Sequence, residues 1–102
     1  NDVNVFLTHI PPIDPVGHRY GGFRSMRVGH RLLARLAEHD VDLTLYGHIH
    51  THIGFENAGI PAHISGGGGA DPMRFDGIDR HFLILDIDPA RPNIDVTVQR
   101  VD

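Results

Sequence analysis

Three histidines stand in two short segments whose pattern is typical of metal ligands. His9 lies in Thr8-His9-Ile10-Pro11-Pro12, and His48 and His50 lie in Gly47-His48-Ile49-His50. Neutral imidazole binds divalent zinc, manganese, iron and nickel well, and histidines at positions i and i+2 can converge on a metal cluster where the backbone turns beyond a strand. Clustered imidazoles without a ligand would need other partners, and each unsatisfied buried group costs about 1–3 kcal/mol. The two segments therefore predict a metal site.

The elements around these segments have the pattern of a βαβ unit. Val3 to Thr8 are mostly apolar and β-branched, which predicts a buried strand with His9 at its carboxyl end. Val41 to Tyr46 alternates as a strand does, and Gly47 ends it. Strands joined by such a crossover are parallel and end at the same edge of the sheet, which is where open α/β sheets bind ligands. We therefore expect all three histidines at one edge.

Between the two strands we expect a loop and one amphipathic helix. Ile10 to Arg24 is rich in proline and glycine, which predicts a long loop beside the site. His18 and Arg24 in this loop are candidate contacts for a substrate phosphate, together with Arg19, because arginine binds phosphate through two parallel hydrogen bonds. Met26 to His39 has apolar residues at helical spacing after a candidate N-cap. That N-cap is Ser25, and the opposite stripe is Arg27, Arg31 and Arg35.

The second half of the chain predicts antiparallel strands and no further helix. The three segments are Ile60 to Ser65, His81 to Ile87 and Ile94 to Val101. The turn-rich connection from Asp88 to Asn93 predicts a terminal hairpin, with Ile94, Val96 and Val98 facing the core. Gly66 to Gly69 is expected to be a permissive turn. The fold class is α/β: a βαβ unit followed by antiparallel strands.

Composition narrows the possible functions. The 102 residues match one domain, 1–102. A net charge of -4 opposes general nucleic-acid binding, and no apolar run approaches the ~20 residues of a membrane-spanning helix. All nine basic residues are arginine and cysteine is absent, which excludes Schiff-base lysines, disulfides and thiolate nucleophiles.

The histidine segments are similar to two motifs of the calcineurin-like metallophosphoesterases. That family has a histidine followed by a proline pair and, later, Gly-His-x-His, which match His9-Ile10-Pro11-Pro12 and Gly47 to His50. The resemblance implies a β-sandwich flanked by helices and two divalent transition-metal ions (Mn, Fe, Zn or Ni). It also implies that His9 and His48 share one ion and that His50 binds the other. Such ions polarise a phosphomonoester or phosphodiester and generate the attacking hydroxide, so the resemblance implies a hydrolase without a protein nucleophile.

The sequence also departs from that family. The motifs Asp-x-His, Gly-Asp-x-x-Asp and Gly-Asn-His, which supply a bridging aspartate, an asparagine ligand and a proton-donating histidine, do not occur. We therefore expect the chain to be the C-terminal part of such a domain, inactive alone and without a catalytic residue of its own beyond the metal ligands. The rest of the domain or a second chain would complete the site.

Other functions remain open at this stage. His52 extends the run to His-x-His-x-His, but the metallo-β-lactamase signature needs aspartate at position 52 and histidine at 53, where this chain has His52 and Ile53. Amidohydrolases use His-x-His in an eight-stranded barrel, for which the chain is too short. A non-catalytic metal-binding or interaction module is the alternative from a different class.

The other charged and polar features have ordinary structural explanations. Asp86 and Asp88 fit a hairpin exit better than a catalytic pair. The histidines outside the two motifs are expected to lie at the surface or in local hydrogen bonds; they are His18, His30, His39, His63 and His81.

Overall fold

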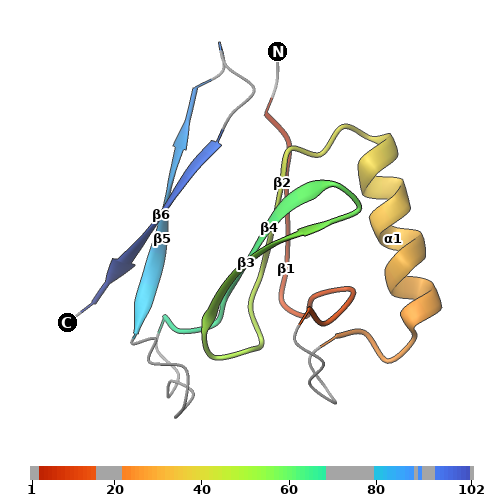
Figure 1. The fold of residues 1–102 in the computed structure, drawn as a ribbon, viewed down its shortest axis with the longest axis horizontal. Helices are drawn as coiled ribbons and strands as arrows, with labels where there is room; N and C mark the ends of the chain where they lie inside the picture. Colours follow the sequence, from red (N-terminus) through yellow and green to blue (C-terminus); the bar gives the residue numbers. More distant parts are fainter. Residues whose placement is uncertain (1–2, 16–21, 69–79, 89, 91–93, 102) are drawn as a thin grey trace.

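The protein is a mixed α/β structure with two sheets and one helix in its described part. The computed structural model describes residues 3–15, 22–68, 80–88, 90 and 94–101. Strands β1 (Val5–Thr8), β2 (Leu43–Tyr46), β3 (His52–Asn57) and β4 (Ile60–Ser65) form a four-stranded sheet, and β5 (His81–Ile87) and β6 (Ile94–Arg100) form a two-stranded one. Helix α1 (Met26–Glu38) lies on one side of the larger sheet and the β5–β6 hairpin on the other (Figure 1).

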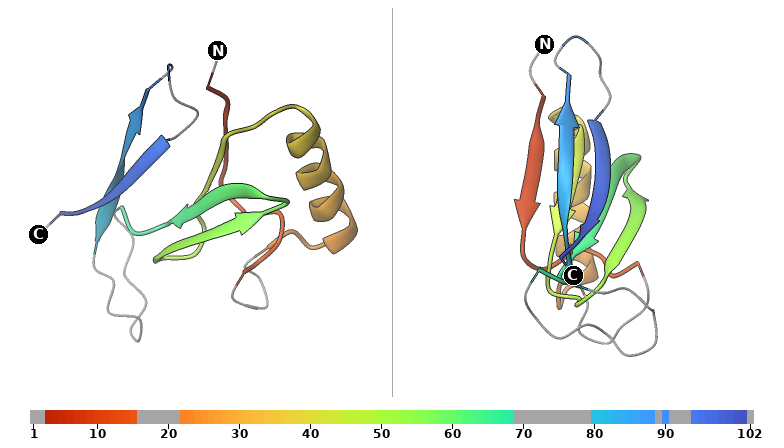
Figure 2. Two further views of the ribbon diagram at one scale, coloured as in Figure 1. Left: turned by 45° about the horizontal axis from the view of Figure 1, so that its top comes forward. Right: turned by 90° about the vertical axis from the view of Figure 1, so that its left-hand side faces the viewer.

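The βαβ unit predicted from the sequence is confirmed. Strands β1 and β2 pair in parallel from Val5 opposite Leu43 to Thr8 opposite Tyr46, with α1 in the connection between them. The left-hand view in Figure 2 shows the hairpin, the larger sheet and α1 one beside the next. Both parallel strands therefore end at the same edge.

The prediction that the first strand is buried is wrong. The strand begins at Val5 rather than Val3, and it lies at the edge of the sheet, in the order β1-β2-β4-β3. Leu7 is 72% exposed and Val5 39% exposed. Leu7 borders a cavity that it shares with Phe82 of β5, so the hairpin does not bury this side of β1. The central strand β2, by contrast, is buried on both faces, since Leu43, Thr44 and Tyr46 are all buried.

In the second half, the prediction of antiparallel strands holds only in part. Strand β4 is antiparallel to β3 but parallel to β2, so it extends the parallel part of the sheet. Strand β3 was not predicted, although Ile53 and Phe55 alternate with polar residues there and a two-residue turn follows. The terminal hairpin is confirmed, with His81 opposite Arg100 and Ile87 opposite Ile94.

The orientation predicted for the last strand is wrong at one position. Ile94 and Val96 are half-buried, but Val98 is 40% exposed. Phe82 on the partner strand is also 49% exposed. The beginning of the hairpin is tied to the end of β4, because Ser65 Oγ bonds to His81 Nε2 and the His81 amide donates to the Gly67 carbonyl just after that strand. Farther along the hairpin, Ile84 and Ile87 are 41% and 46% exposed.

The core lies between the larger sheet and the helix, and it contains a buried polar network. Tyr46, Ile49, Ala62 and Ile64 form a buried apolar cluster. Beside it, the Tyr46 hydroxyl donates to Asn57 Oδ1 at 2.6 Å. The Asn57 amide nitrogen in turn donates to Thr44 Oγ1 and to the Ile60 carbonyl, at 3.1 and 3.2 Å. These bonds satisfy the buried groups and tie β2 to the β3–β4 hairpin. Burial also raises the pKa of Tyr46.

Helix α1 begins and packs as its sequence indicates. Ser25 is the N-cap, and its side chain accepts a hydrogen bond from the Val28 amide at 3.2 Å. The helix buries Gly29 and Leu33 and exposes the arginine stripe, which confirms the predicted amphipathic arrangement. It ends one residue before the predicted end, with His39 as the C-cap. The helix is too short and polar to span a membrane, and the described residues form no other helix.

One substitution in the turn between β3 and β4 should make the chain more stable. Its two central residues, Ala58 and Gly59, have φ angles of 51° and 77°, the left-handed pair that two-residue hairpins need. The left-handed conformation costs alanine about 1–2 kcal/mol, whereas asparagine adopts this conformation more readily. We expect Ala58→Asn to stabilise the chain by ~0.5–1 kcal/mol in urea unfolding. Ala34→Asn, on the exposed helix surface, should instead destabilise it; equal effects would contradict the assignment to the turn.

Candidate metal site

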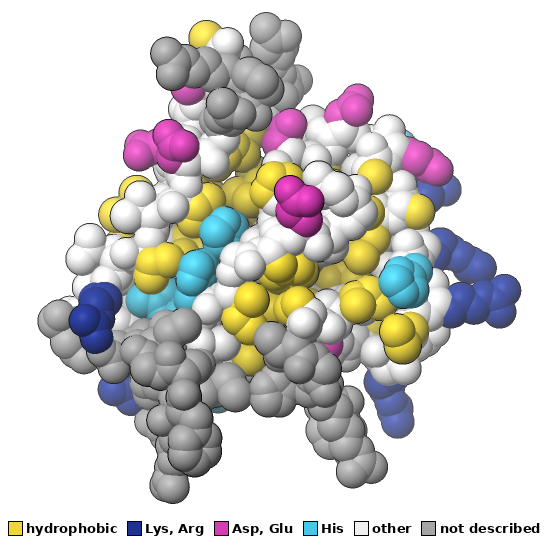
Figure 3. Space-filling view, in the orientation of Figure 1, with side chains coloured by type: hydrophobic (Ala, Val, Ile, Leu, Met, Phe, Trp, Pro, Cys, Tyr) yellow, Lys and Arg dark blue, Asp and Glu magenta, His cyan; other side chains and the backbone are white. Residues whose placement is uncertain are grey.

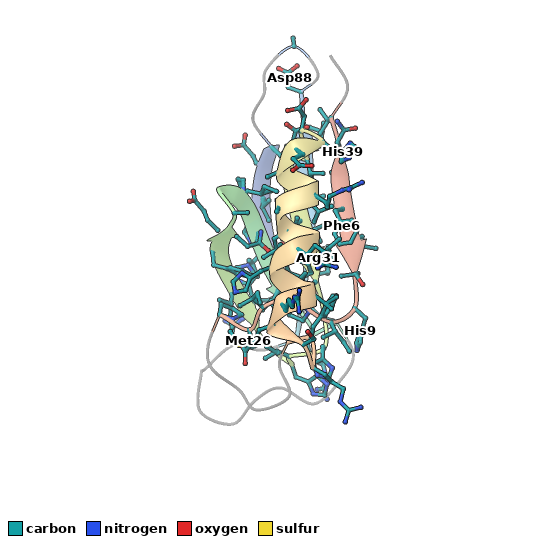
Figure 4. All side chains as sticks on the ribbon, turned by 90° about the vertical axis from the view of Figure 1, so that its right-hand side faces the viewer. Phe6, His9, Met26, Arg31, His39 and Asp88 are labelled. Atoms are coloured by element: carbon teal, nitrogen blue, oxygen red, sulfur yellow. The ribbon has the colours of Figure 1, made fainter. Side chains whose placement is uncertain are left out.

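Two of the predicted metal ligands meet at the carboxyl edge of the parallel strands. The Gly47 amide donates to the His9 carbonyl at 2.8 Å, which continues the β1–β2 pairing one residue beyond the strands. The rings of His9 and His48 then lie edge to face, with centroids 5.3 Å apart and an angle of 78° between their planes. Figure 4 shows His9 at the same end of the molecule as Met26, while His39 and Asp88 lie at the opposite end.

The loop after β2 alternates between outward histidines and buried residues. Ile49 is 7% exposed and Thr51 is 3% exposed, whereas His50 is exposed. The Ile49 amide donates to the Gly47 carbonyl, and the Thr51 amide donates to the Ile49 carbonyl, both at 2.8 Å. Burial of every second residue therefore explains the i, i+2 spacing of the histidines. The loop 47–51 is held in place by the Gly66 amide, which donates to the Thr51 carbonyl at 3.1 Å.

The backbone of His48 adopts a conformation that costs free energy. Its φ angle is 70°, in the left-handed region that disfavours residues with a Cβ. Strain of this kind is concentrated at functional sites, where the position of a side chain matters more than local stability. Gly47 next to it leaves room for His9, because a Cβ on Gly47 would stand 3.3 Å from His9 Nδ1.

We expect two substitutions at His48 to distinguish the effect of backbone strain on stability from the effect of losing the imidazole ring. His48→Gly removes both the ring and the left-handed strain, while His48→Ala removes the ring and keeps the strain. The glycine variant should be about 1 kcal/mol more stable than the alanine variant in urea unfolding of the metal-free chain. Equal stability of the two variants would show that the backbone at His48 is unstrained.

The described residues supply only part of the ligand set that a metal ion needs. Two imidazoles lie edge to face and a third follows two residues later, and imidazole nitrogens are ligands that transition-metal ions bind. However, no three histidine, aspartate or glutamate side chains of the described residues converge on one ion position. Arg24 is exposed just before α1, and His18 and Arg19 lie outside the described residues. The roles predicted for these three residues in phosphate binding stay predictions.

A second group of histidines lies where the sequence predicted local hydrogen bonds only. His52 Nε2 and His63 Nδ1 are 2.9 Å apart across the β3–β4 pair, and Ser65 Oγ bonds to His81 Nε2 at 3.0 Å. These bonds confirm the prediction for His63 and His81. The pairing of His52 was missed because β3 itself was not recognised. Alternation over 52–57 followed by a two-residue turn would have placed His52 and His63 on neighbouring strands.

The surroundings lower the pKa values of His52 and His63. Burial lowers the pKa of His63, and burial together with repulsion from His63 and His81 lowers the pKa of His52. In the unfolded chain a histidine has a pKa of ~6.5. Because the pKa is lower in the folded chain, the unfolded chain binds more protons than the folded chain once the pH falls below ~6.5. His63 therefore contributes stability that is fully present above that pH and is lost as the pH falls through its folded pKa.

This shift predicts an acid-sensitive fold. In chelator-treated samples, the urea midpoint of the wild-type chain should fall between pH 7.5 and pH 5, and it should fall less in His63→Gln. His30→Gln, which alters an exposed histidine of α1, should keep the wild-type slope. The assignment to His63 is wrong if the two variants have the same pH dependence.

No protein-family model, curated protein or solved structure matches this chain.

Proposed function

We propose that the chain is the C-terminal part of a calcineurin-like metallophosphoesterase domain, a hydrolase of phosphomonoesters or phosphodiesters. The observation that supports this most directly is the meeting of His9 and His48 beyond two parallel strands, with His48 in a strained backbone conformation. Residues with this chemistry at the carboxyl edge of a parallel sheet are typical of a catalytic or binding site.

In this proposal the chain supplies imidazole ligands and positions them. His9 and His48 would hold one divalent ion, and His50, which is exposed on the loop 47–51, would hold the second. When bound, the two ions supply the electrophile for the phosphate and the activation of the attacking water. The buried residues Ile49 and Thr51 keep the two loop histidines on one side. The larger fold is then one part of a metallophosphoesterase β-sandwich.

The remaining ligands and the acid for the leaving group come from outside these 102 residues. The open edge of β1, with Leu7 72% exposed, supports a further part of the domain or a second chain at this side. A cavity of about 520 Å³ lies between β1, β2 and β5, and His9, Gly47 and Phe82 are among its lining residues. An added segment along β1 would border both this cavity and the histidines.

The test uses the protein at the full length that its gene encodes, loaded with manganese and assayed on an aryl phosphomonoester and an aryl phosphodiester. His48→Ala should remove bound metal and reduce hydrolysis by more than the roughly 10–100-fold cost of losing an outer-shell partner of a metal ligand. His39→Ala, at the far end of α1, is the matched control and should retain activity.

Two outcomes would overturn the proposal. Hydrolysis unaffected by His48→Ala would remove the metal site from the reaction. Metal bound through His48 without hydrolysis of either ester would favour the non-catalytic metal-binding module instead.

A further inference from the structure

A second pair of histidines lies on the face of the β3–β4 hairpin that is turned away from the core. His63 stands opposite Gly54 in the register, and His52 stands opposite Ser65. The core side of the same strands carries Ile64, which is fully buried. His52 and His63 are half-buried. Figure 3 shows histidine side chains gathered at the surface over β3, β4 and the beginning of β5.

The two rings hold their nitrogens at a separation suited to one metal ion. His52 Nε2 and His63 Nδ1 are 2.9 Å apart, and the ring planes are within 20° of parallel. Two ligands at adjacent corners of a square-planar or octahedral ion, each about 2.05 Å from it, are about 2.9 Å apart, whereas tetrahedral ligands are about 3.3 Å apart. The observed separation thus matches tetragonal coordination without a change in the strands.

The surroundings leave this pair accessible. Gly54 stands opposite His63 across the hairpin, is exposed, and has no side chain that could cover the ring. His81 lies edge-on to His52, with ring centroids 5.8 Å apart, but its Nε2 is bonded to Ser65 Oγ. His81 is therefore a neighbour of the pair and not a third ligand in this geometry.

We propose that His52 Nε2 and His63 Nδ1 form a cis pair of ligands for Cu(II) or Ni(II), separate from the site at His9 and His48. Square-planar and tetragonal nitrogen coordination is characteristic of these two ions. Binding replaces the hydrogen bond between the rings. The donor ring moves its proton to its other nitrogen, so both rings stay neutral and each gives one lone pair to the ion. Water fills the remaining positions.

The test uses the protein with His48→Ala and His50→Ala as the parent, which removes two of the other candidate ligands. Titration with Cu(II), followed by electron paramagnetic resonance, should give one bound ion whose spectrum has the splitting of two nitrogen ligands. His63→Gln in this parent should weaken binding by about tenfold or more and remove one nitrogen. His52→Gln should do the same.

The control is His30→Gln in the same parent, because His30 is an exposed histidine on α1, away from the hairpin. It should leave the affinity and the spectrum unchanged. Far-ultraviolet circular dichroism of each variant checks that the fold is retained. Copper bound equally well without His63, or weakened as much by His30→Gln, would overturn the proposal. Since the parent lacks two of the histidines of the proposed phosphoesterase site, either result is independent of that function.

Discussion

Gly66→Ala should destabilise the chain by about 1–3 kcal/mol or more, the usual cost of forcing an extra carbon into a packed position. A Cβ on Gly66 would overlap the Ile49 carbonyl oxygen and stand 2.7 Å from the carbonyl carbon. Both atoms belong to the backbone of the loop 47–51, so no side-chain rotation can relieve the contact. The loop or the end of β4 must move apart, which breaks the hydrogen bond from the Gly66 amide to the Thr51 carbonyl.

Urea unfolding of the metal-free variant measures this effect, and Gly68→Ala provides the matched control. The nearest atom to a Cβ on Gly68 is the His81 carbonyl oxygen at 3.8 Å, an ordinary contact. We expect that variant to remain close to the wild type. In the metal-loaded protein, Gly66→Ala should also weaken metal binding, because His48 and His50 stand on the displaced loop. Equal stability of the two variants would mean that the loop does not pack on Gly66.

The elements that the sequence predicted well are those whose signals are local. Ser25 caps α1 as expected, and the helical spacing of Met26 to Glu38 is visible without knowledge of the rest of the chain. The parallel pairing of β1 and β2 follows from the crossover between them. The meeting of His9 and His48 could therefore be predicted from strand ends alone.

The errors concern features that depend on distant partners. The apolar residues of β1 suggested burial, but their exposure depends on which elements flank the strand, and β1 lies at an edge. The same reasoning explains Val98, which was predicted to face the core and is 40% exposed. Strand β3 is a different case, because the alternation of Ile53 and Phe55 and the turn after the strand are local signals that were overlooked. The contact between His52 and His63 was missed with them.

The glycines show a second limit of sequence patterns. The run Gly66 to Gly69 was interpreted as a permissive turn, yet Gly66 does not have a positive φ angle and its requirement is space beside Ile49. That requirement arises from a segment fifteen or more positions earlier in the chain and leaves no local signature. The loop 47–51, which carries His48 and His50, is therefore positioned by residues that carry no chemistry themselves.

Gly29→Ala provides the corresponding test at the other histidine segment. In an exposed helix this change would stabilise the chain by about 1 kcal/mol. Here a Cβ would overlap the Pro12 carbonyl oxygen and stand 2.9 Å from the carbonyl carbon. That oxygen also accepts a hydrogen bond from the Phe23 amide, so it cannot move without disturbing the loop.

We therefore expect the opposite sign for Gly29→Ala: a loss of about 1–3 kcal/mol in urea unfolding. Val28→Ala, one residue earlier and 51% exposed, should change stability by about 0.5 kcal/mol or less, because only helix propensity is altered. Since Pro12 follows His9 by three residues, the displaced loop should also weaken metal binding in Gly29→Ala and leave it intact in Val28→Ala. A stabilised Gly29→Ala variant would show that α1 does not approach the proline pair this closely, and the position of His9 would then depend on β1 alone.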